Sequence, residues 1–156
     1  MDQRPKYRKL TLPPIEPRWR RVGAIVQIWD ALRGQWLVLT PEEWVRRHLI
    51  EFLIRHCGAQ PLRIVQEYPV PLNGQAQRAD VVVVDDEARP LLLAECKGPD
   101  IEINQQTSAQ AMRYNGVLGA RYVVLTNGLK HYCYESTPEG YRPLREFPKL
   151  APADSI

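Results

Sequence analysis

Two short apolar runs, residues 79–84 (ADVVVV) and 91–96 (LLLAEC), constrain the fold of this chain more than any other feature. Continuous apolar runs of this length are typical of β-strands that are covered on both faces, and such strands lie in the middle of a sheet. The polar segment 85–90 predicts a loop that joins the two runs as an antiparallel pair. We therefore expect a sheet whose central strands lie in the hydrophobic core.

The segments around this pair predict two helices and further strands. Thr40 and Pro41 suit the cap and the first position of a helix that runs to Cys57 and ends at Gly58. A second helix is expected over residues 104–118. Strands are expected over residues 22–29 and 35–39 as an N-terminal β-hairpin, over 62–68 with Pro69 and Pro71 as breakers, and over 121–126 and 129–134. This order predicts an α/β (α+β) fold, in which helices flank a mixed central sheet.

Length and composition exclude several classes of protein. With 156 residues, of which 44% are apolar, the chain has the size and composition of one ordinary domain. No apolar run approaches the roughly 20 residues needed to cross a bilayer. We expect a cytoplasmic protein that makes no membrane contact. The three cysteines form no CxxC pair, so neither a disulfide framework nor a zinc site is indicated.

Charge and proline content divide the chain into three segments. Residues 1–21 hold seven Lys or Arg against two acidic residues and show no periodicity, which predicts a basic, Pro-rich, extended arm. Residues 22–136 contain the expected helices and strands and form the folded domain. Residues 137–156 are expected to follow the surface as a Pro-rich tail. A basic arm suits a polyanionic partner, although a solubilising tail would account for the same charge.

Charged residues end both central strands. In an antiparallel pair the numbers of facing residues have a constant sum, so a four-residue loop between Asp85 and Pro90 sets Asp80 opposite Glu95. Facing side chains have their Cβ atoms about 5 Å apart. Two carboxylates at that distance repel each other unless a positive charge lies between them. Lys97, two positions after Glu95, shares its face of the strand.

These side chains suit the metal-assisted hydrolysis of a phosphodiester. Mg²⁺ binds carboxylate oxygens, water and substrate phosphate, and a lysine beside the metal can help to deprotonate an attacking water. In the alternative interpretation, these residues are the charged end of a surface hairpin that forms a salt bridge with Lys97. A loop of another length would shift the register, and a shift by one residue would move one carboxylate to the other face. The residues alone leave both interpretations open.

The second expected helix carries two polar side chains on one face. Gln110 and Tyr114 are spaced i, i+4, and Val117 lies on the same stripe, which predicts that this face packs towards the sheet. A buried glutamine needs hydrogen-bond partners, and a metal-bound water or a substrate phosphate would supply them. Taken alone, the pattern favours a core tyrosine with the glutamine at the solvent edge.

The sequence resembles the PD-(D/E)xK nuclease superfamily in three elements that occur in the same order: Asp80, Glu95-Cys96-Lys97 and Gln110-x-x-x-Tyr114. The last element is typical of the RecB-like branch of this superfamily. The segments LTPEEWVRRHLIEFL, RAD, ECK, QAMRYN and VLTNG are similar to the N-terminal nuclease domain of type I restriction enzyme R subunits. The similarity covers roughly residues 22–135. It departs from the superfamily pattern at Ala79, where the superfamily name has a proline.

The resemblance implies a restriction-endonuclease-like αβββαβ core and a Mg²⁺-dependent DNA nuclease in which Mn²⁺ can substitute. It implies that Asp80 and Glu95 bind the metal and that Lys97 assists the attacking water. Related nucleases take one more acidic contact from the first helix, where Glu43 is the expected residue and Glu51 the alternative; Glu43 also fits a capping box. The residues expected to contact nucleic acid are Arg78, Lys97, Gln110 and Tyr114.

Full R subunits carry a helicase motor, but this sequence has no GxxxxGK[ST] phosphate loop. Two alternatives to an independent nuclease therefore stay open. One is a catalytically silent module for nucleic-acid binding or assembly, and the other is a subunit that is active only with a separate motor or specificity partner. Double-strand cutting with one active site per chain would favour a homodimer.

Overall fold

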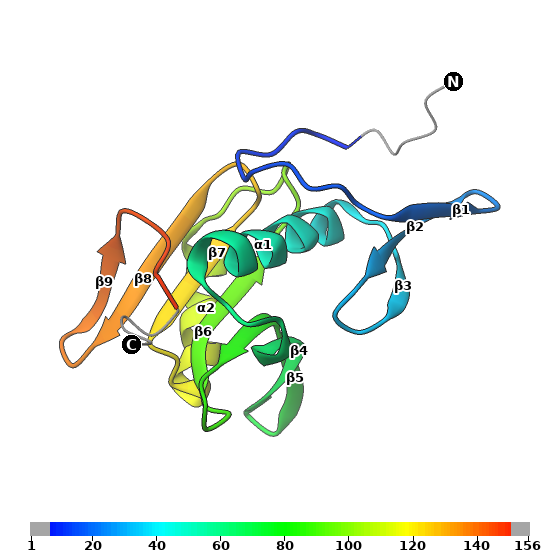
Figure 1. Cartoon of the computed structure of the whole chain (residues 1–156). Coiled ribbons are helices and arrows are strands. Elements are labelled where there is room, and N and C mark those ends of the chain that lie inside the picture. The colour runs from blue at the N-terminus through cyan, green and yellow to red at the C-terminus, as the bar shows by residue number, and fades with distance from the viewer. Residues whose placement is uncertain (1–6, 151–156) are drawn as a thin grey trace, which may run out of the picture.

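The structure is a computed structural model that describes residues 7–150, and they form two α-helices and two β-sheets (Figure 1). The helices are α1 (Pro41–Cys57) and α2 (Gln105–Leu118), and a short 3₁₀ helix spans Pro61–Arg63. The strands are β1 (Trp19–Val22), β2 (Ile25–Asp30), β3 (Gln35–Val38), β4 (Ile64–Leu72), β5 (Gln75–Val84), β6 (Pro90–Cys96), β7 (Tyr122–Thr126), β8 (His131–Thr137) and β9 (Gly140–Leu144).

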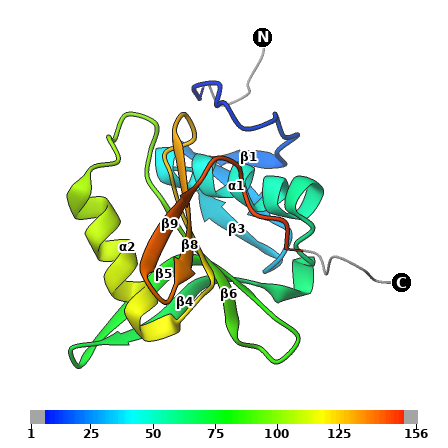
Figure 2. The same ribbon diagram turned by 90° about the vertical axis from the view of Figure 1, so that its left-hand side faces the viewer.

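The larger sheet has the strand order β4-β5-β6-β7-β8-β9 and is mixed, as expected. Strands β6 and β7 run parallel because α2 crosses over between them, whereas the other neighbours are antiparallel. Helix α1 buries Leu49 and Leu53 against one face, and α2 buries Ala111 and Tyr114 against the other. Figure 2 shows the two helices on opposite sides of the strands. The expected central sheet flanked by helices is confirmed.

The register of β5 and β6 brings the charged ends of these strands together. Val81 faces Ala94, and the same register extended by one pair sets Asp80 beside Glu95. At the loop the register shifts, so that the last residue of β5 faces the first residue of β6. The constant sum expected from a regular loop therefore holds at the charged end, although the loop itself is irregular.

Helix α1 begins and ends where the sequence predicts. The Thr40 hydroxyl oxygen accepts a hydrogen bond from the backbone N–H of Glu43 at 3.0 Å, and Pro41 is the first helical residue. At the other end Gly58 adopts a left-handed conformation, with φ 82°, and its N–H donates to the carbonyl of Leu53. Local chemistry therefore positions the start of α1, which lies next to the candidate site.

The expected N-terminal hairpin is confirmed by the antiparallel pair β2 and β3, whereas the residues before it differ from the expected extended arm. A turn at Gly23, with φ 61°, divides the expected strand 22–29, so β1, β2 and β3 form a separate three-stranded antiparallel sheet. Leu10 and Leu12 are buried in the core on the α1 side. Gly128 makes room for this segment, because a Cβ there would lie 2.7 Å from Cδ2 of Leu10. Residues 7–22 are thus docked or paired, and residues 1–6 lie outside the described residues.

Two further expectations are wrong. Strand β4 continues through Pro69 and Pro71, because it is an edge strand and proline there costs no hydrogen bond on its open side. The expected surface tail instead forms β9, which pairs with β8, and Phe147 packs against the core. The backbone N–H of Leu150 donates to the carbonyl of Cys57 at 2.7 Å. Within residues 7–150, neither helix has the length and apolar character that a bilayer crossing requires.

A buried ionic network ties the three-stranded sheet to the rest of the molecule. Asp30, at the end of β2, is fully buried, and its Oδ1 lies 2.9 Å from a terminal nitrogen of Arg47 on α1. It also accepts hydrogen bonds from Arg33 and from the side-chain amide of Gln66 on β4. Burial acts to raise the pKa of Asp30, but the hydrogen bonds and charges of the two arginines outweigh it, so the pKa is lowered.

We predict that Asp30→Asn lowers the free energy of unfolding at pH 7 by about 3 kcal/mol, because it leaves Arg47 buried with less negative charge around it. A carboxyl whose pKa is lowered on folding stabilises above its unfolded pKa and loses that contribution as the pH falls. The difference between variant and wild type should therefore shrink below the unfolded value of 3.8. Urea unfolding at several pH values measures it.

The matched control is Asp86→Asn, which removes an exposed carboxylate paired with Arg63. We expect it to change the free energy of unfolding by less than about 1 kcal/mol. A similar small change for Asp30→Asn would contradict the anchoring role of Asp30.

Candidate active site

Two carboxyl groups meet at the end of the β5–β6 pair. Glu95 on β6 is 9% exposed, and Asp80 on β5 is partly buried. Oδ2 of Asp80 accepts a hydrogen bond from the backbone N–H of Cys96 at 2.7 Å, which holds Asp80 against β6. The carboxyl groups of Asp80 and Glu95 are close enough for a hydrogen bond between them when one is protonated. The structure thus brings together the pair of acids that the register predicted.

Glu95 lacks the partners that a buried carboxyl group needs. Its Oε1 is buried and has no hydrogen-bond partner among the described residues. Burial, and then the negative charge of Asp80, raise the pKa of Glu95 to about 10. At neutral pH this group therefore keeps its proton unless a cation takes the proton's place. An orphaned carboxyl oxygen beside a second carboxylate suits a divalent metal ion bound by oxygen ligands.

Lys97 provides positive charge that acts on this pair. Its backbone N–H donates to the carbonyl of Thr126 at 2.9 Å, so the residue after β6 is fixed to the end of β7. The charge of Lys97 acts to lower the pKa of Glu95 and that of Glu42. The ammonium group therefore acts on these carboxyl groups through its charge, although Lys97 forms no ion pair with them among the described residues.

Glu43, the acid that the sequence indicates from the first helix, forms ion pairs with two arginines of α1. Its carboxylate accepts a hydrogen bond from Nε of Arg46 at 3.1 Å, and Nε of Arg47 lies 3.0 Å from it. Glu51, the alternative, pairs with Arg55 at 2.8 Å. Both side chains are thus engaged in ion pairs along α1, and neither is placed beside Asp80 and Glu95 by any contact among the described residues.

Glu42 is an acid of α1 that interacts through its charge with the carboxylate pair. Partial burial and then the negative charge of Asp80 raise the pKa of Glu42, whereas Lys97 opposes this shift. Sequence reasoning did not single out this residue, because two acids follow each other in the first turn and the capping-box pattern pointed to the second one.

Arg46 is a further residue that sequence reasoning missed. Burial acts to lower the pKa of Arg46, but its hydrogen bond to Glu43 and the charge of Asp80 outweigh burial, so the pKa is raised. Its guanidinium is therefore a second positive charge that acts on the site from α1. No motif signals it, because its position depends on how α1 packs against the sheet.

A groove of about 620 Å³ opens between the start of α1 and the segment after β6. Glu42 and Gly98 are among the residues that line it. A Cβ on Gly98 would lie 3.1 Å from Cβ of Pro41, so glycine allows these segments to approach closely. Glu43 and Asp100 also line this groove, whereas Asp80, Glu95 and Lys97 do not. Another groove, of about 560 Å³, lies between residues 14–18, β2 and α1 and is lined by none of these site residues.

Gln110 and Tyr114 join a hydrogen-bonded chain from α2 to β5. The amide nitrogen of Gln110 donates to the Tyr114 hydroxyl at 2.8 Å, and that hydroxyl donates to Oε1 of Gln77 at 3.3 Å. Tyr114 is a core residue and Gln110 is exposed, as the pattern predicts. Among the described residues, no hydrogen bond joins either of them to the carboxylate pair. Arg78, also expected to contact nucleic acid, is exposed on β5.

The site is therefore a pair of carboxyl groups with a third acid beside it. In residues 7–150, no three acidic, histidine or cysteine side chains form a ready-made metal cluster. Mg²⁺ does not need one, since it is commonly bound by one or two carboxylates and completes its shell with water and substrate phosphate. The residues present fit such an ion, with Asp80 and Glu95 as its ligands.

Comparisons with known proteins bear on this geometry. The sequence family described as "Type I restriction enzyme R protein N terminus (HSDR_N)" matches residues 41–148. A solved fragment described as an HsdR subunit of a type I restriction enzyme from Vibrio vulnificus YJ016 is similar, with a TM-score of 0.54 and 22% identity. The match covers 71% of this chain and 24% of that one, and it shows a restriction-endonuclease-like fold. No curated protein matches.

We predict that Mn²⁺ raises the melting temperature of the wild type, and more so at pH 8 than at pH 6, because protons compete with the ion for Glu95. An ion that binds only the folded state at about 10 to 100 times its Kd adds about 1–3 kcal/mol. Asp80→Asn and Glu95→Gln should lose this shift, whereas Glu51→Gln should keep it. Differential scanning fluorimetry measures all four proteins, and an equal shift in Glu95→Gln would contradict the assignment.

A second expectation follows from the same carboxyl group in EDTA. Because the pKa of Glu95 is higher in the folded state, the folded protein binds more protons than the unfolded chain between the unfolded value of 4.5 and about 10. The stability of the wild type therefore falls as the pH rises through this window. Glu95→Gln should remove that part of the pH dependence, which urea unfolding at several pH values would reveal.

Proposed function

Because the chain belongs to the family of type I restriction enzyme R protein N termini, we propose that it is a divalent-metal-dependent nuclease domain that hydrolyses DNA phosphodiester bonds. The observation that carries this proposal is the buried carboxyl pair of Asp80 and Glu95, whose orphaned oxygen suits a metal ligand. We place its action in the cytoplasm, on DNA of a restriction system. Double-strand cutting would require two copies of the domain.

In this proposal Asp80 and Glu95 hold Mg²⁺, or Mn²⁺ in its place, and Glu42 is a further acidic contact at the mouth of the site. When bound, the ion supplies positive charge for the scissile phosphate and lowers the pKa of a water molecule. The acids by themselves would repel a phosphodiester, so the arrangement favours substrate only in the presence of cations. This requirement explains why buried carboxyl groups meet without direct ion-pair partners.

Lys97 has the role of positioning the attacking water or a phosphate oxygen. Its ammonium group offers hydrogen-bond donors beside the carboxylates, and its backbone is fixed to β7 through Thr126. Arg46 supports the same site from α1, because its charge balances part of the negative charge of Asp80. Neither cation forms an ion pair with Asp80 or Glu95 among the described residues, so both carboxyl groups stay available for the proposed metal ion.

Gln110 and Arg78 are proposed to contact the DNA backbone, since both are exposed. Tyr114 is proposed to act through Gln110, whose amide nitrogen it binds, and so to fix the direction of that side chain. The buried Tyr114 ring also holds α2 against the sheet. Its loss would therefore affect both the fold and the orientation of Gln110.

A second function is favoured by a specific observation. This chain spans about a quarter of the similar HsdR fragment, so the domain could act only together with a separate motor or specificity subunit. A catalytically silent module that binds DNA is the remaining alternative. DNA binding that needs no divalent ion and survives Lys97→Ala, without cleavage, would favour the silent module.

We predict that the protein cuts plasmid DNA in the presence of Mg²⁺, and that Asp80→Ala and Lys97→Ala lower the rate by about 100-fold or more. Agarose gels with EDTA as the control measure this. Wild-type protein that cuts no faster than Asp80→Ala would refute an independent nuclease. Cleavage that appears only after addition of the motor and specificity subunits would support the partner-dependent alternative.

Glu42→Gln and Glu43→Gln form a matched pair that tests the role of the first helix. Both change one acid of the same helical turn into its neutral isostere. We expect Glu42→Gln to slow cleavage by about tenfold or more with little change in melting temperature. Glu43→Gln should mainly lower the melting temperature, because Arg46 and Arg47 lose a counter-ion. The reverse pattern would assign the metal contact to Glu43.

A further inference from the structure

The three-stranded sheet turns one face, here called the outer face, towards solvent. Ile28 and Asp30 of β2 are buried, so the alternate residues of the strand point outwards. In the register, Arg20 faces Gln27, Gln27 faces Val38, and Trp29 faces Trp36. The carbonyl of Arg18 accepts a hydrogen bond from the N–H of Trp29 at 2.8 Å, which adds Arg18 to the tryptophan row. The outer face comprises Arg18, Arg20, Gln27, Trp29, Trp36 and Val38, and the exposed apolar pair Val22 and Ile25 continues it towards the turn at Gly23.

The tryptophans hold the two arginines in place. The guanidinium carbon of Arg18 lies 4.9 Å from the ring centre of Trp29 and 5.3 Å from that of Trp36. That of Arg20 lies 4.4 Å from Trp36, and its Nε donates to Oε1 of Gln27 at 2.7 Å. Stacking on an indole uses the flat face of a guanidinium and leaves its in-plane N–H donors available. The arginines are therefore preorganised to bind an anion.

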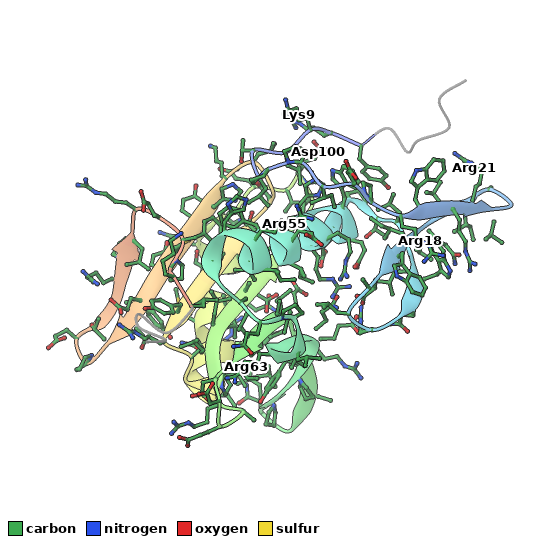
Figure 3. The ribbon with its side chains drawn as sticks, in the orientation of Figure 1. Lys9, Arg18, Arg21, Arg55, Arg63 and Asp100 are labelled. Carbon is green, nitrogen blue, oxygen red and sulfur yellow. The ribbon has the colours of Figure 1, made fainter. Side chains whose placement is uncertain are left out.

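None of the residues of the outer face is acidic, although Glu16 lines a groove together with Arg18 and Trp29. Asp30 is the only acid in residues 18–40, and it is buried on the opposite side of the sheet in its network with Arg33 and Arg47. Arg18, Arg20 and the neighbouring Arg21 make no ion pair within residues 7–150. Figure 3 shows Arg18 and Arg21 on the β1–β2 part of this sheet. The surface thus carries unpaired positive charge on a rigid support.

The outer face lies close to the candidate active site along the chain. Strand β3 ends at Val38, and Glu42 follows four residues later, a distance of at most about 14 Å even for an extended chain. Figure 1 shows β3 leading into the start of α1. The Asp30 network fixes the sheet to α1 and β4. These strands precede residues 41–148 that match the family, so they add a surface to the shared core.

We propose that the outer face binds the phosphate backbone of double-stranded DNA next to the candidate active site. This proposal rests on the proposed function, because it takes DNA as the substrate. The guanidinium groups of Arg18 and Arg20, which lie over the tryptophan rings, bind phosphate oxygens. Contacts of this type position a duplex without reading its sequence, and they release counterions, so affinity falls steeply with salt concentration.

The test is the affinity of the full chain for a short fluorescent duplex, measured by anisotropy in EDTA over a range of salt concentrations. Loss of two phosphate contacts in Arg18→Ala/Arg20→Ala should weaken binding by about tenfold or more and reduce the salt slope by about 2. The matched control is Arg121→Ala/Arg142→Ala, which removes the same charge near β7 and β9 and should change affinity by less than about twofold.

Two further variants separate preorganised stacking from charge. Trp36→Leu keeps both arginines and removes the ring that contacts them, so it should weaken binding by a smaller factor with an unchanged salt slope. Arg18→Lys/Arg20→Lys keeps the charge and should retain most of the salt slope. Melting temperatures close to that of the wild type verify that each variant is folded.

Equal affinity and equal salt slope for wild type and Arg18→Ala/Arg20→Ala would overturn the proposal. The proposal would also be overturned if the outer face joined two copies of the chain. In that case sedimentation would show a dimer, and Val38→Ser would dissociate it without loss of DNA affinity. The outcome for the proposed function is separate. If the wild type cleaves DNA with Mg²⁺ and Arg18→Ala/Arg20→Ala binds DNA as tightly as the wild type, only the docking surface is refuted. If DNA binding depends on these arginines but no cleavage occurs, only the independent nuclease is refuted.

Discussion

The convergence of Asp80 and Glu95 at the buried end of the β5–β6 pair is the constraint on which the candidate site depends. Two neighbouring carboxyl groups with little access to water cannot both ionise without a nearby cation. The fold keeps them there through the β-register and through the hydrogen bond from Cys96 N–H to Asp80. Lys97 and Arg46 offset part of the charge. The carboxyl pair still lacks a direct cationic partner among the described residues, and this is the reason for proposing a metal ion there.

The buried network around Asp30 has a second effect on the same site. It binds Arg47, which together with Arg46 engages Glu43. These ion pairs fix the side chain of Glu43 along α1, although Glu42 and Glu43 both line the groove at the start of this helix. One polar network therefore orients α1 and holds the three-stranded sheet beside it. It connects the acid next to the candidate site with the surface proposed to bind DNA.

The match to type I restriction enzyme R protein N termini and the restriction-endonuclease-like fold agree on the core of the molecule. Before this core, the chain has the sheet β1–β3, which precedes the matched residues 41–148. The docked segment of residues 7–18 covers apolar surface that would otherwise face water. These N-terminal residues change what can approach the candidate site without altering the β5–β6 pair.

The sequence by itself determined the elements whose causes are local: the apolar strands 79–84 and 91–96, the capped helix after Thr40, and the register that sets Asp80 beside Glu95. Tertiary structure alone decided that Glu43 pairs with Arg46 and Arg47, because these contacts depend on how α1 packs. It also decided that residues 7–18 dock, that β4 passes through its prolines, and that β9 forms. These outcomes depend on contacts between residues far apart in the chain, which local propensity and spacing do not contain.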